Sequence, residues 1–330
     1  MQARLTDLPD SLTDPLSDLL KLMRLDGALF LEARFTAPWC VVSACPGALV
    51  AAGAGHVVFF HIVTKGRCRV RLRDGGEAIE VSAGDLVLIA HNEEHLLGSD
   101  LQLAPVDTAT LPLRRLSPGG LLRMEHGGGG DETRVMCGFL SCDPLLSRPL
   151  LDALPRLLRV PLGHGPAAQW LLALVERGAL ENSAPGPGSG TMLAKLAELL
   201  FVEAMRYHLN TIPEGQAGWL AGLRDRHVGR ALALLHEEPM RDWTVELLAE
   251  HSGLSRSVLT QRFADLVGLP PMQYLKRWRL RLAAAALEDN RLPIATLAGQ
   301  YGYESEASFN RAFKQIYGAP PAAWRRQRAA

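Results

Sequence analysis

The sequence predicts a multidomain α+β protein, with an antiparallel β-barrel or sandwich near the N-terminus, then helices, then an all-α domain. Two observations support this fold class. Residues 28–145 contain short strand-like runs separated by turns rich in Gly and Asp. Near the C-terminus, "FADLVGLPPMQY" at 263–274 is matched fifty positions later by "FKQIYGAPPAAW" at 313–324. Phe, Gly, Pro-Pro and an aromatic residue recur at the same spacing, which indicates two copies of one structural unit.

The composition is ordinary for a globular protein. The 330 residues suffice for two domains, and 48% of them are hydrophobic and 21% charged. No apolar run approaches the roughly 20 residues of a membrane span. The start, "MQARLTDLPD", lacks the features of a secretory signal. Five cysteines, a low and odd number, argue against a disulfide framework. We therefore expect a cytoplasmic protein with no membrane partner.

The net charge of zero is unevenly distributed. Residues 218–330 hold 16 Lys and Arg against 11 Asp and Glu, and the rest of the chain holds 19 against 24. A basic C-terminal third favours a polyanionic partner for that part alone. A solvated surface would show the same composition.

The N-terminal elements follow in order. Asp14 and Pro15 begin a helix that we expect to end at Gly27. "HVVFFHIV" at 56–63 and "RCRVRLR" at 67–73 then read as strands, the second with strict alternation. Residues 149–160 predict a helix broken at Pro155, and residues 167–182 and 191–210 predict two more helices around a loop at 183–190. The two later helices either pair with a second subunit or pack onto the barrel.

Two helix-turn-helix patterns fill the C-terminal region. In the first, Thr244 caps a short helix, Gly253 makes the turn, and Ser255 caps a second helix that buries Leu259 and Phe263. In the second, Gly302 repeats the turn, Ser305 repeats the cap, and Phe309 and Phe313 repeat the buried positions. We expect domains at 1–165, 166–215 and 216–330, the middle one being a helical linker with possible dimerisation helices.

A helix at 270–289 connects the two patterns. Twenty helical residues span about 30 Å, close to the ~34 Å between successive major grooves on one side of B-DNA. Lys276, Arg277, Arg279 and Arg281 make this helix basic. It is therefore suited to hold the two patterns at adjacent major grooves.

Residues 218–330 resemble the DNA-binding domain of the AraC/XylS family of bacterial transcription regulators, whose C-terminal signature is matched by "LAGQYGYESEASFNRAFKQIYGAPPAAWRR". The resemblance implies seven helices, double-stranded promoter DNA as partner, and activation through contact with RNA polymerase. It places Arg256, Ser257, Thr260 and Gln261, and Glu306, Ala307, Asn310 and Arg311, at groove-facing positions. Arg, Gln and Asn suit base edges, whereas Glu306 is a departure that either accepts from cytosine or faces solvent. Phosphate contacts are expected from Arg262 and from amides near Thr244, Ser255 and Ser305.

The strand region resembles the cupin-like sensor domain of one branch of these regulators. "GDLVLIAHNEEHLL" at 84–97 has the Gly-Asp turn and the His of a cupin second motif. The first-motif metal ligands are missing, because Gly53, Gly55 and Phe59 occupy their positions. His56, His61 and His95 remain candidates for an effector or zinc site. In the alternative that we favour, His61 is a satisfied core residue and His91 and His95 lie at a rim.

The cysteines offer a second route for a signal. Cys40 and Cys45, like Cys137 and Cys142, are five positions apart, an odd step that puts the two sulfurs of a pair on opposite faces of a strand. Buried thiols acting as small hydrophobes are the default interpretation, and a redox switch is the alternative.

Together these features predict a sequence-specific DNA-binding regulator, with an activator role expected, whose cupin domain receives an unknown small-molecule or redox signal. Two other functions remain open: a metal-dependent cupin enzyme with an accessory DNA-binding domain, and a non-specific architectural DNA binder. No nucleophile–base pair is apparent, so we expect no enzymatic activity.

Overall fold

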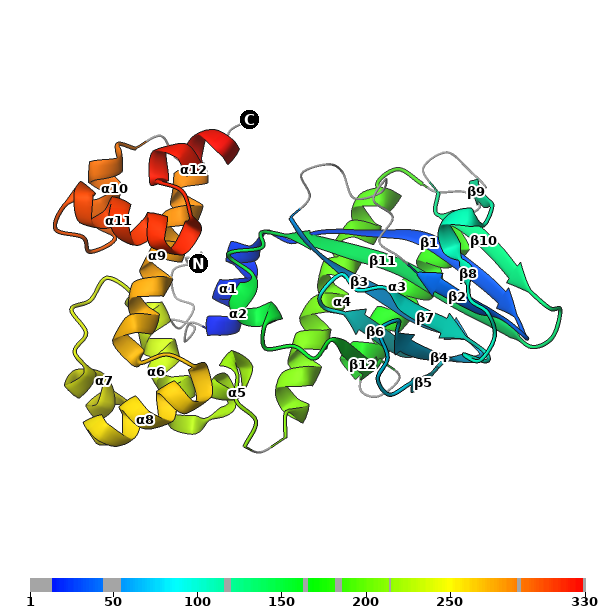
Figure 1. Cartoon of the computed structure of the whole chain (residues 1–330), viewed down its shortest axis with the longest axis horizontal. Coiled ribbons are helices and arrows are strands. Elements are labelled where there is room, and N and C mark those ends of the chain that lie inside the picture. The colour runs from blue at the N-terminus through cyan, green and yellow to red at the C-terminus, as the bar shows by residue number, and fades with distance from the viewer. Residues whose placement is uncertain are drawn as a thin grey trace, which may run out of the picture. The chain divides into compact units, whose positions relative to one another are not determined.

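The computed structural model describes residues 14–43, 55–115, 120–162, 166–181, 186–213, 215–289 and 292–328. It separates into two compact units (Figure 1). The β-unit contains the described residues of the ranges 25–144 and 154–211, and the helical unit contains those of the ranges 1–24, 145–153 and 212–330. This division differs from the expected boundaries, because the N-terminal helix and residues 145–153 group in space with the C-terminal helices.

The β-unit is built from two sheets. The seven-stranded sheet has the order β12 (Leu157–Pro161), β6 (Asp85–Ile89), β3 (His56–Lys65), β11 (Glu132–Cys142), β1 (Asp26–Thr36), β10 (Leu122–Gly127), β9 (Leu113–Arg115). The five-stranded sheet has the order β5 (Ile79–Ser82), β4 (Arg67–Leu72), β7 (His95–Gly98), β2 (Cys40–Ser43), β8 (Val106–Asp107), and a 3-10 turn follows at Thr108–Thr110. The pairs β1–β10 and β2–β8 are parallel and the others antiparallel. Apolar side chains from both sheets form one core, as in a jelly roll.

The helix expected at 149–160 is wrong over its second half. Only Arg148–Leu151 forms a helix (α2), and Leu157–Pro161 forms strand β12, which pairs antiparallel with β6. Leu158 and Val160 are buried while Arg159 between them is exposed. That alternation is the pattern of a strand with one covered face, and Pro155 separates the two elements.

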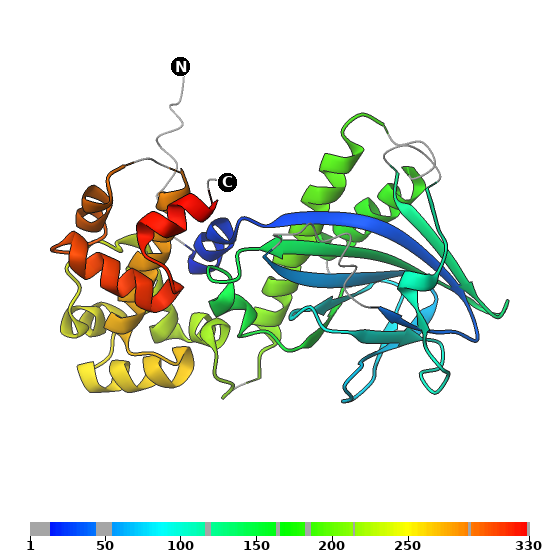
Figure 2. The ribbon, with the colours of Figure 1, turned by 45° about the horizontal axis from the view of Figure 1, so that its top comes forward.

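Helices α3 (Pro166–Glu181) and α4 (Ser189–Thr211) belong to the β-unit. Helix α4 packs against β1, β11 and β12 of the larger sheet, and α3 packs against α4 (Figure 2). A Cβ on Gly27 would lie 2.8 Å from the Cβ of Ala197, so glycine permits the close approach of α4 to β1. Of the two expected roles, packing onto the sheet is therefore found. Trp170 and Leu199 nevertheless remain 56% and 42% exposed.

The helical unit holds α1 (Pro15–Met23), α2 and eight further helices within 215–328. These eight are α5 (Trp219–Arg224), α6 (Arg226–Glu237), α7 (Val245–Ser252), α8 (Arg256–Val267), α9 (Pro271–Asp289), α10 (Ile294–Gln300), α11 (Glu306–Tyr317) and α12 (Pro321–Arg328). The expected number was seven. The difference arises at Asp225, whose extended backbone separates α5 from α6 while its side chain caps α6. No helix among the described residues combines the length and apolar character needed to cross a membrane.

Helix α1 is part of the helical unit although it precedes the β-unit in sequence. Asp14 caps it as expected, by accepting a hydrogen bond from the Leu16 amide at 3.1 Å. It ends at Arg24 in the left-handed conformation, not at Gly27, which lies in β1. Within this unit, Arg24 pairs with Glu288 at 2.8 Å, and a carboxylate oxygen of Asp18 lies 3.4 Å from the buried His236 ring. Residues distant in sequence thereby contribute to the unit that carries the two repeated motifs.

Candidate nucleic-acid interface

The two repeated motifs have the same backbone hydrogen bonds at their turns. The Leu254 amide donates to the Ala249 carbonyl at 3.0 Å, and the Tyr303 amide donates to the Ala298 carbonyl at 2.9 Å. Both turns contain a glycine with positive φ, 70° at Gly253 and 78° at Gly302. Because other residues adopt this conformation only at a cost, glycine is required twice. The expected duplication of a helix-turn-helix is confirmed.

The buried positions also repeat. Leu259 and Phe263 of α8 are fully buried, and so are Phe309 and Phe313 of α11. In the second motif Phe313 contacts Phe309, Tyr317 and Trp324, with ring centroids 4.5–5.7 Å apart. The second helix of each motif, α8 or α11, is therefore fixed by one apolar face, and its opposite face is left for solvent or a partner.

Helix α9 connects the motifs as expected. Glycines with positive φ, Gly268 and Gly318, end α8 and α11, and a proline begins the next helix in each case. Figures 1 and 2 show α8 and α11 near opposite ends of α9. Its 19 residues correspond to about 28 Å, close to one turn of B-DNA.

The predicted capping residues have the expected geometry. The hydroxyl oxygens of Thr244, Ser255 and Ser305 accept hydrogen bonds from the amides of the residues three positions on, at 3.1, 3.4 and 3.2 Å. All three caps are exposed, so the amide-rich beginnings of α7, α8 and α11 face solvent. Such helix beginnings favour anions such as phosphate.

Of the predicted base-contacting residues of α8, Arg256, Ser257 and Gln261 are exposed and Thr260 is half-buried, and three of the four bond neighbouring groups of α7 or α8. Arg256 forms a 2.8 Å ion pair with Glu246 of α7, and Gln261 donates to Asp265 at 2.7 Å. The Thr260 hydroxyl donates to the Arg256 carbonyl at 2.8 Å, and Ser257 is exposed at the same surface. These acidic neighbours were not anticipated from the sequence, although the four-residue step from Gln261 to Asp265 would have revealed one of them.

Arg262, expected at a phosphate, is held by Asp225. Its guanidinium donates two hydrogen bonds to one carboxylate oxygen, at 2.9 and 2.5 Å. The same carboxylate accepts from the amides of His227 and Val228, and these donors keep the pKa of Asp225 below its usual value despite partial burial. Arg262 therefore links α8 to the beginning of α6.

The corresponding face of α11 is less engaged. Glu306, Ala307 and Arg311 are exposed and Asn310 is half-buried. Within the described part of the chain, neither Glu306 nor Arg311 has an ion pair, in contrast to Arg256. Glu306 stands in the first turn of α11, where a carboxylate complements the helix dipole.

The comparisons with known proteins agree with this arrangement. A cupin family model matches residues 14–210, and a helix-turn-helix domain model matches residues 248–327. An AraC-like transcription regulator of Streptomyces antibioticus is 34% identical over 95% of this chain and 98% of its own. The chain belongs to the AraC/XylS family. It is a DNA-binding transcription regulator with a cupin-like N-terminal domain.

Two further similar proteins share less of their sequence with this chain. The transcriptional regulator AlkR of Acinetobacter baylyi is 29% identical over 95% of this chain and 99% of its own. Among solved structures, the DNA-binding domain of AdpA in complex with a target DNA is 29% identical, covering 31% of this chain and 92% of that domain, with a TM-score of 0.30.

The β-unit of this AraC/XylS protein contains a buried chain of hydrogen bonds. His95 Nδ1 lies 2.8 Å from the Glu93 carbonyl, so it carries the proton and leaves Nε2 as acceptor. His61 Nε2 then donates to His95 Nε2 at 2.6 Å, and His61 Nδ1 accepts from the Cys137 thiol at 3.0 Å. These hydrogen bonds link the two sheets, because His61 lies on β3 of the larger sheet and His95 on β7 of the smaller one. Every nitrogen of the two neutral rings has a partner.

This geometry bears on the histidine hypotheses. Burial lowers the pKa of His61 well below its usual value, and the His95 ring lowers it further; burial also lowers the pKa of His95. His56 lies on the other face of β3 and bonds the Ala90 carbonyl at 2.6 Å, so it does not join the pair. Among the described residues no three His, Cys, Asp or Glu side chains are grouped to hold a metal. His61 is a satisfied core residue, but His95, expected at a rim, is buried.

The described cysteines have the properties of core residues. Cys40, Cys68 and Cys137 are buried thiols, and Cys142 is buried with its sulfur 3.6 Å from the His56 carbonyl. Burial raises the pKa of Cys40, and it raises the pKa of Cys137 to about 12. Cys45 lies outside the described residues. Because the thiolate is the reactive form, these environments disfavour rapid oxidation at neutral pH.

Proposed function

We propose that α8 and α11 enter two successive major grooves of promoter DNA and read its sequence. The observation that supports this proposal is the pair of matched turns. Each turn leads into a 12-residue helix with one buried and one accessible face, and the two helices lie near opposite ends of α9. The predicted groove-facing positions lie on the accessible faces.

The contacts assigned to each helix follow from its side chains. On α11, Arg311 bonds guanine and Asn310 bonds adenine, while Glu306 stays at the solvent-facing first turn. On α8, Arg256 and Gln261 make the base contacts after leaving Glu246 and Asp265. Ser257, Thr260 and Ala307 supply smaller contacts, and the capped beginnings of α7, α8 and α11 bind phosphates.

The β-unit is the candidate receiver of the signal that controls DNA binding, and the protein acts in the cytoplasm on chromosomal DNA. Activation proceeds through contact with RNA polymerase, as the family resemblance implies. A homodimer would use α3 and α4, because Trp170 and Leu199 expose apolar surface there. The curated relatives are named as regulators, which favours this function over that of a metal-dependent enzyme.

The test begins with selection of bound fragments from genomic DNA, followed by competition. Specific binding survives excess random DNA, whereas binding through the backbone alone does not. Replacing Arg311 with Ala should relax sequence choice, and replacing the exposed Arg326 of α12 serves as a control of equal charge. Failure to enrich any sequence, with purified protein that is folded by circular dichroism, would overturn the proposal.

A further inference from the structure

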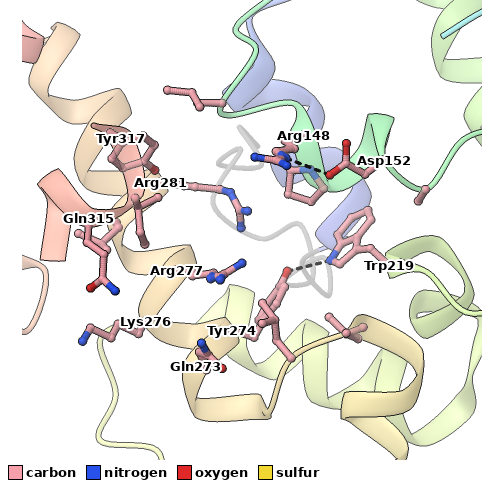
Figure 3. Close-up of a pocket in the computed structure, with 18 of the residues that line it drawn as sticks. Arg148, Asp152, Trp219, Gln273, Tyr274, Lys276, Arg277, Arg281, Gln315 and Tyr317 are labelled. Carbon is pink, nitrogen blue, oxygen red and sulfur yellow. Dashed lines mark hydrogen bonds and ion pairs between the residues drawn. The ribbon is translucent and has the colours of Figure 1, made fainter. Parts of the chain in front are cut away.

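A cavity of about 790 Å³ lies within the helical unit (Figure 3). Its wall combines α2, the beginning of α5, the turn from α8 into α9, one side of α9 and the last turn of α11. The volume falls in the range of small-molecule sites, which are commonly about 300–1,000 Å³. Both helix-turn-helix motifs and a short helix from the middle of the chain therefore line one space that is open to solvent on one side.

The cavity carries an excess of positive charge. Arg148, Lys276, Arg277 and Arg281 line it, and Asp152 is the only acidic side chain among the described lining residues. Asp152 already pairs with Arg148 at 3.1 Å. In Figure 3 the guanidinium groups of Arg277 and Arg281 extend from α9 toward the side that carries Arg148 and Trp219. Cationic groups from two elements thus converge on the same space.

Arg281 is only partly exposed and is not neutralised by a carboxylate within the described part of the chain. Burial lowers the pKa of its guanidinium, and the neighbouring Arg277 lowers it further, whereas the hydroxyls of Tyr274 and Tyr317 oppose this. Cations held close together in a partly buried site repel one another. A bound anion would relieve that repulsion.

The rest of the wall is aromatic and well ordered by hydrogen bonds. The Trp219 indole donates to the Tyr274 hydroxyl at 2.9 Å, and that hydroxyl lies 2.7 Å from His236 Nε2. Tyr317 forms part of the opposite wall. Trp219, Tyr274 and Tyr317 are buried, so these rings form a firm floor beneath the guanidinium groups, which extend into the cavity.

We propose that this cavity binds a phosphorylated organic molecule, with its phosphate between Arg277 and Arg281 and its organic part in the remaining space of the cavity. Planar guanidinium groups match phosphate oxygens with two parallel hydrogen bonds. A phosphate dianion compensates the charge excess better than a single carboxylate. The volume is too large for an inorganic ion alone.

The position of the cavity distinguishes this role from DNA contact. Its wall uses Val267 and Gly268 at the end of α8, and Ala312 and residues 315–317 in the second half of α11. The predicted base-contacting residues stand in the first halves of these helices, at 256–261 and 306–311. A ligand here leaves those residues accessible, and it affects the placement of one motif relative to the other. This regulatory part of the inference rests on the proposed function, whereas ligand binding itself does not.

Binding is tested first without DNA. Adenosine monophosphate and fructose bisphosphate are titrated into the full-length protein by calorimetry, with benzoate as a monoanion of similar aromatic character. At least one phosphate should bind, and Arg277→Gln and Arg281→Gln should each weaken it at least about tenfold. Arg326→Gln, a control outside the cavity, should leave affinity for the phosphate compound unchanged. Circular dichroism of every variant identifies any that fails to fold, and Arg281→Lys, which keeps the positive charge, provides a milder change at the same position. Binding of benzoate with equal affinity, or equal loss in Arg326→Gln, would overturn the assignment.

Phosphate binding is then compared with DNA binding. If Arg277→Gln and Arg281→Gln weaken affinity for all DNA sequences alike and flatten its salt dependence, while no phosphate compound binds, these side chains contact the DNA backbone and the cavity proposal is wrong. If the ligand binds but the protein selects no DNA sequence, the cavity assignment stands and the proposed function fails. If the ligand binds and shifts affinity for a selected site, both are supported.

Discussion

The ion pair between Arg256 and Glu246 leads to a prediction with an unusual sign. Replacing Glu246 with Gln should tighten DNA binding, because Arg256 no longer has to leave a carboxylate before it reaches a base. The pair measures 2.8 Å, and the two side chains are 70% and 60% exposed. Pairs as exposed as this contribute about 0–1 kcal/mol. Its release therefore accounts for at most about a fivefold gain in affinity.

A second effect of the substitution must be separated from the first. Removing any negative charge from a DNA-binding surface also favours association with phosphates. Glu250 is the matched control, since it lies on the same helix α7, is exposed, and forms no ion pair with a described residue. Glu250→Gln should tighten binding less than Glu246→Gln. The difference between the two variants isolates the release of Arg256.

The assay is fluorescence anisotropy with a selected DNA site at low and moderate salt. A double-mutant cycle with Arg256→Ala completes it: in that background, Glu246→Gln should lose its advantage over Glu250→Gln. Three results would contradict this prediction: equal effects of the two glutamate variants, weaker binding by Glu246→Gln, or an advantage of Glu246→Gln that persists without Arg256. Weaker binding would mean that Glu246 orients Arg256 for base contact.

Core packing, groove contact and acid sensitivity yield three more predictions. Phe313→Ala should destabilise the helical unit by about 3–5 kcal/mol in urea unfolding, because the ring is fully buried; a cost below ~1 kcal/mol would contradict this packing. Arg311→Ala should lose about 1–3 kcal/mol of discrimination at one base pair, measured by competition among site variants, and uniform weakening would contradict base contact. His61 and His95 have pKa values below 6.5 in the fold, so below that pH the unfolded chain binds more protons. The contribution of these two neutral rings to the free energy of unfolding should therefore be fully present above about pH 6.5 and decrease as the pH falls below it. Equal unfolding free energies at about pH 7.5 and about pH 5.5 would contradict the burial of His61 and His95 as neutral rings.

The helix-turn-helix motifs could be predicted because their signals are local. Gly253 and Gly302 mark turns that need positive φ, and Ser255 and Ser305 mark helix beginnings, each within four residues of what they determine. Because the two motifs repeat at a spacing of about 50 residues, the turn and cap assigned in one motif could be checked against those assigned in the other. The one residue added between the second turn and Ser305 was also visible in the sequence.

Elements that depend on distant partners were predicted less well. Residues 157–161 have an apolar pattern that fits a helix when read alone, and only pairing with β6, some seventy residues earlier, makes them a strand. The same limit applied to His95. Its burial follows from the approach of β7 to β3 across two sheets, which no spacing along the chain reveals.

The basic residues of α9 show how composition can mislead about DNA contact. The sequence presents Lys276, Arg277, Arg279 and Arg281 as one basic stretch, yet the fold gives them different surroundings. Arg279 donates to the carbonyls of Pro239 and Arg241 at 2.6 and 2.9 Å, and so it holds the loop between α6 and α7 to α9. Arg277 and Arg281 line the cavity. Since the salt dependence of DNA binding counts neutralised phosphates, its slope should be smaller than the charge excess of residues 218–330 would suggest. A basic side chain can neutralise a DNA phosphate only if it is accessible and is not already bound to other groups of the protein.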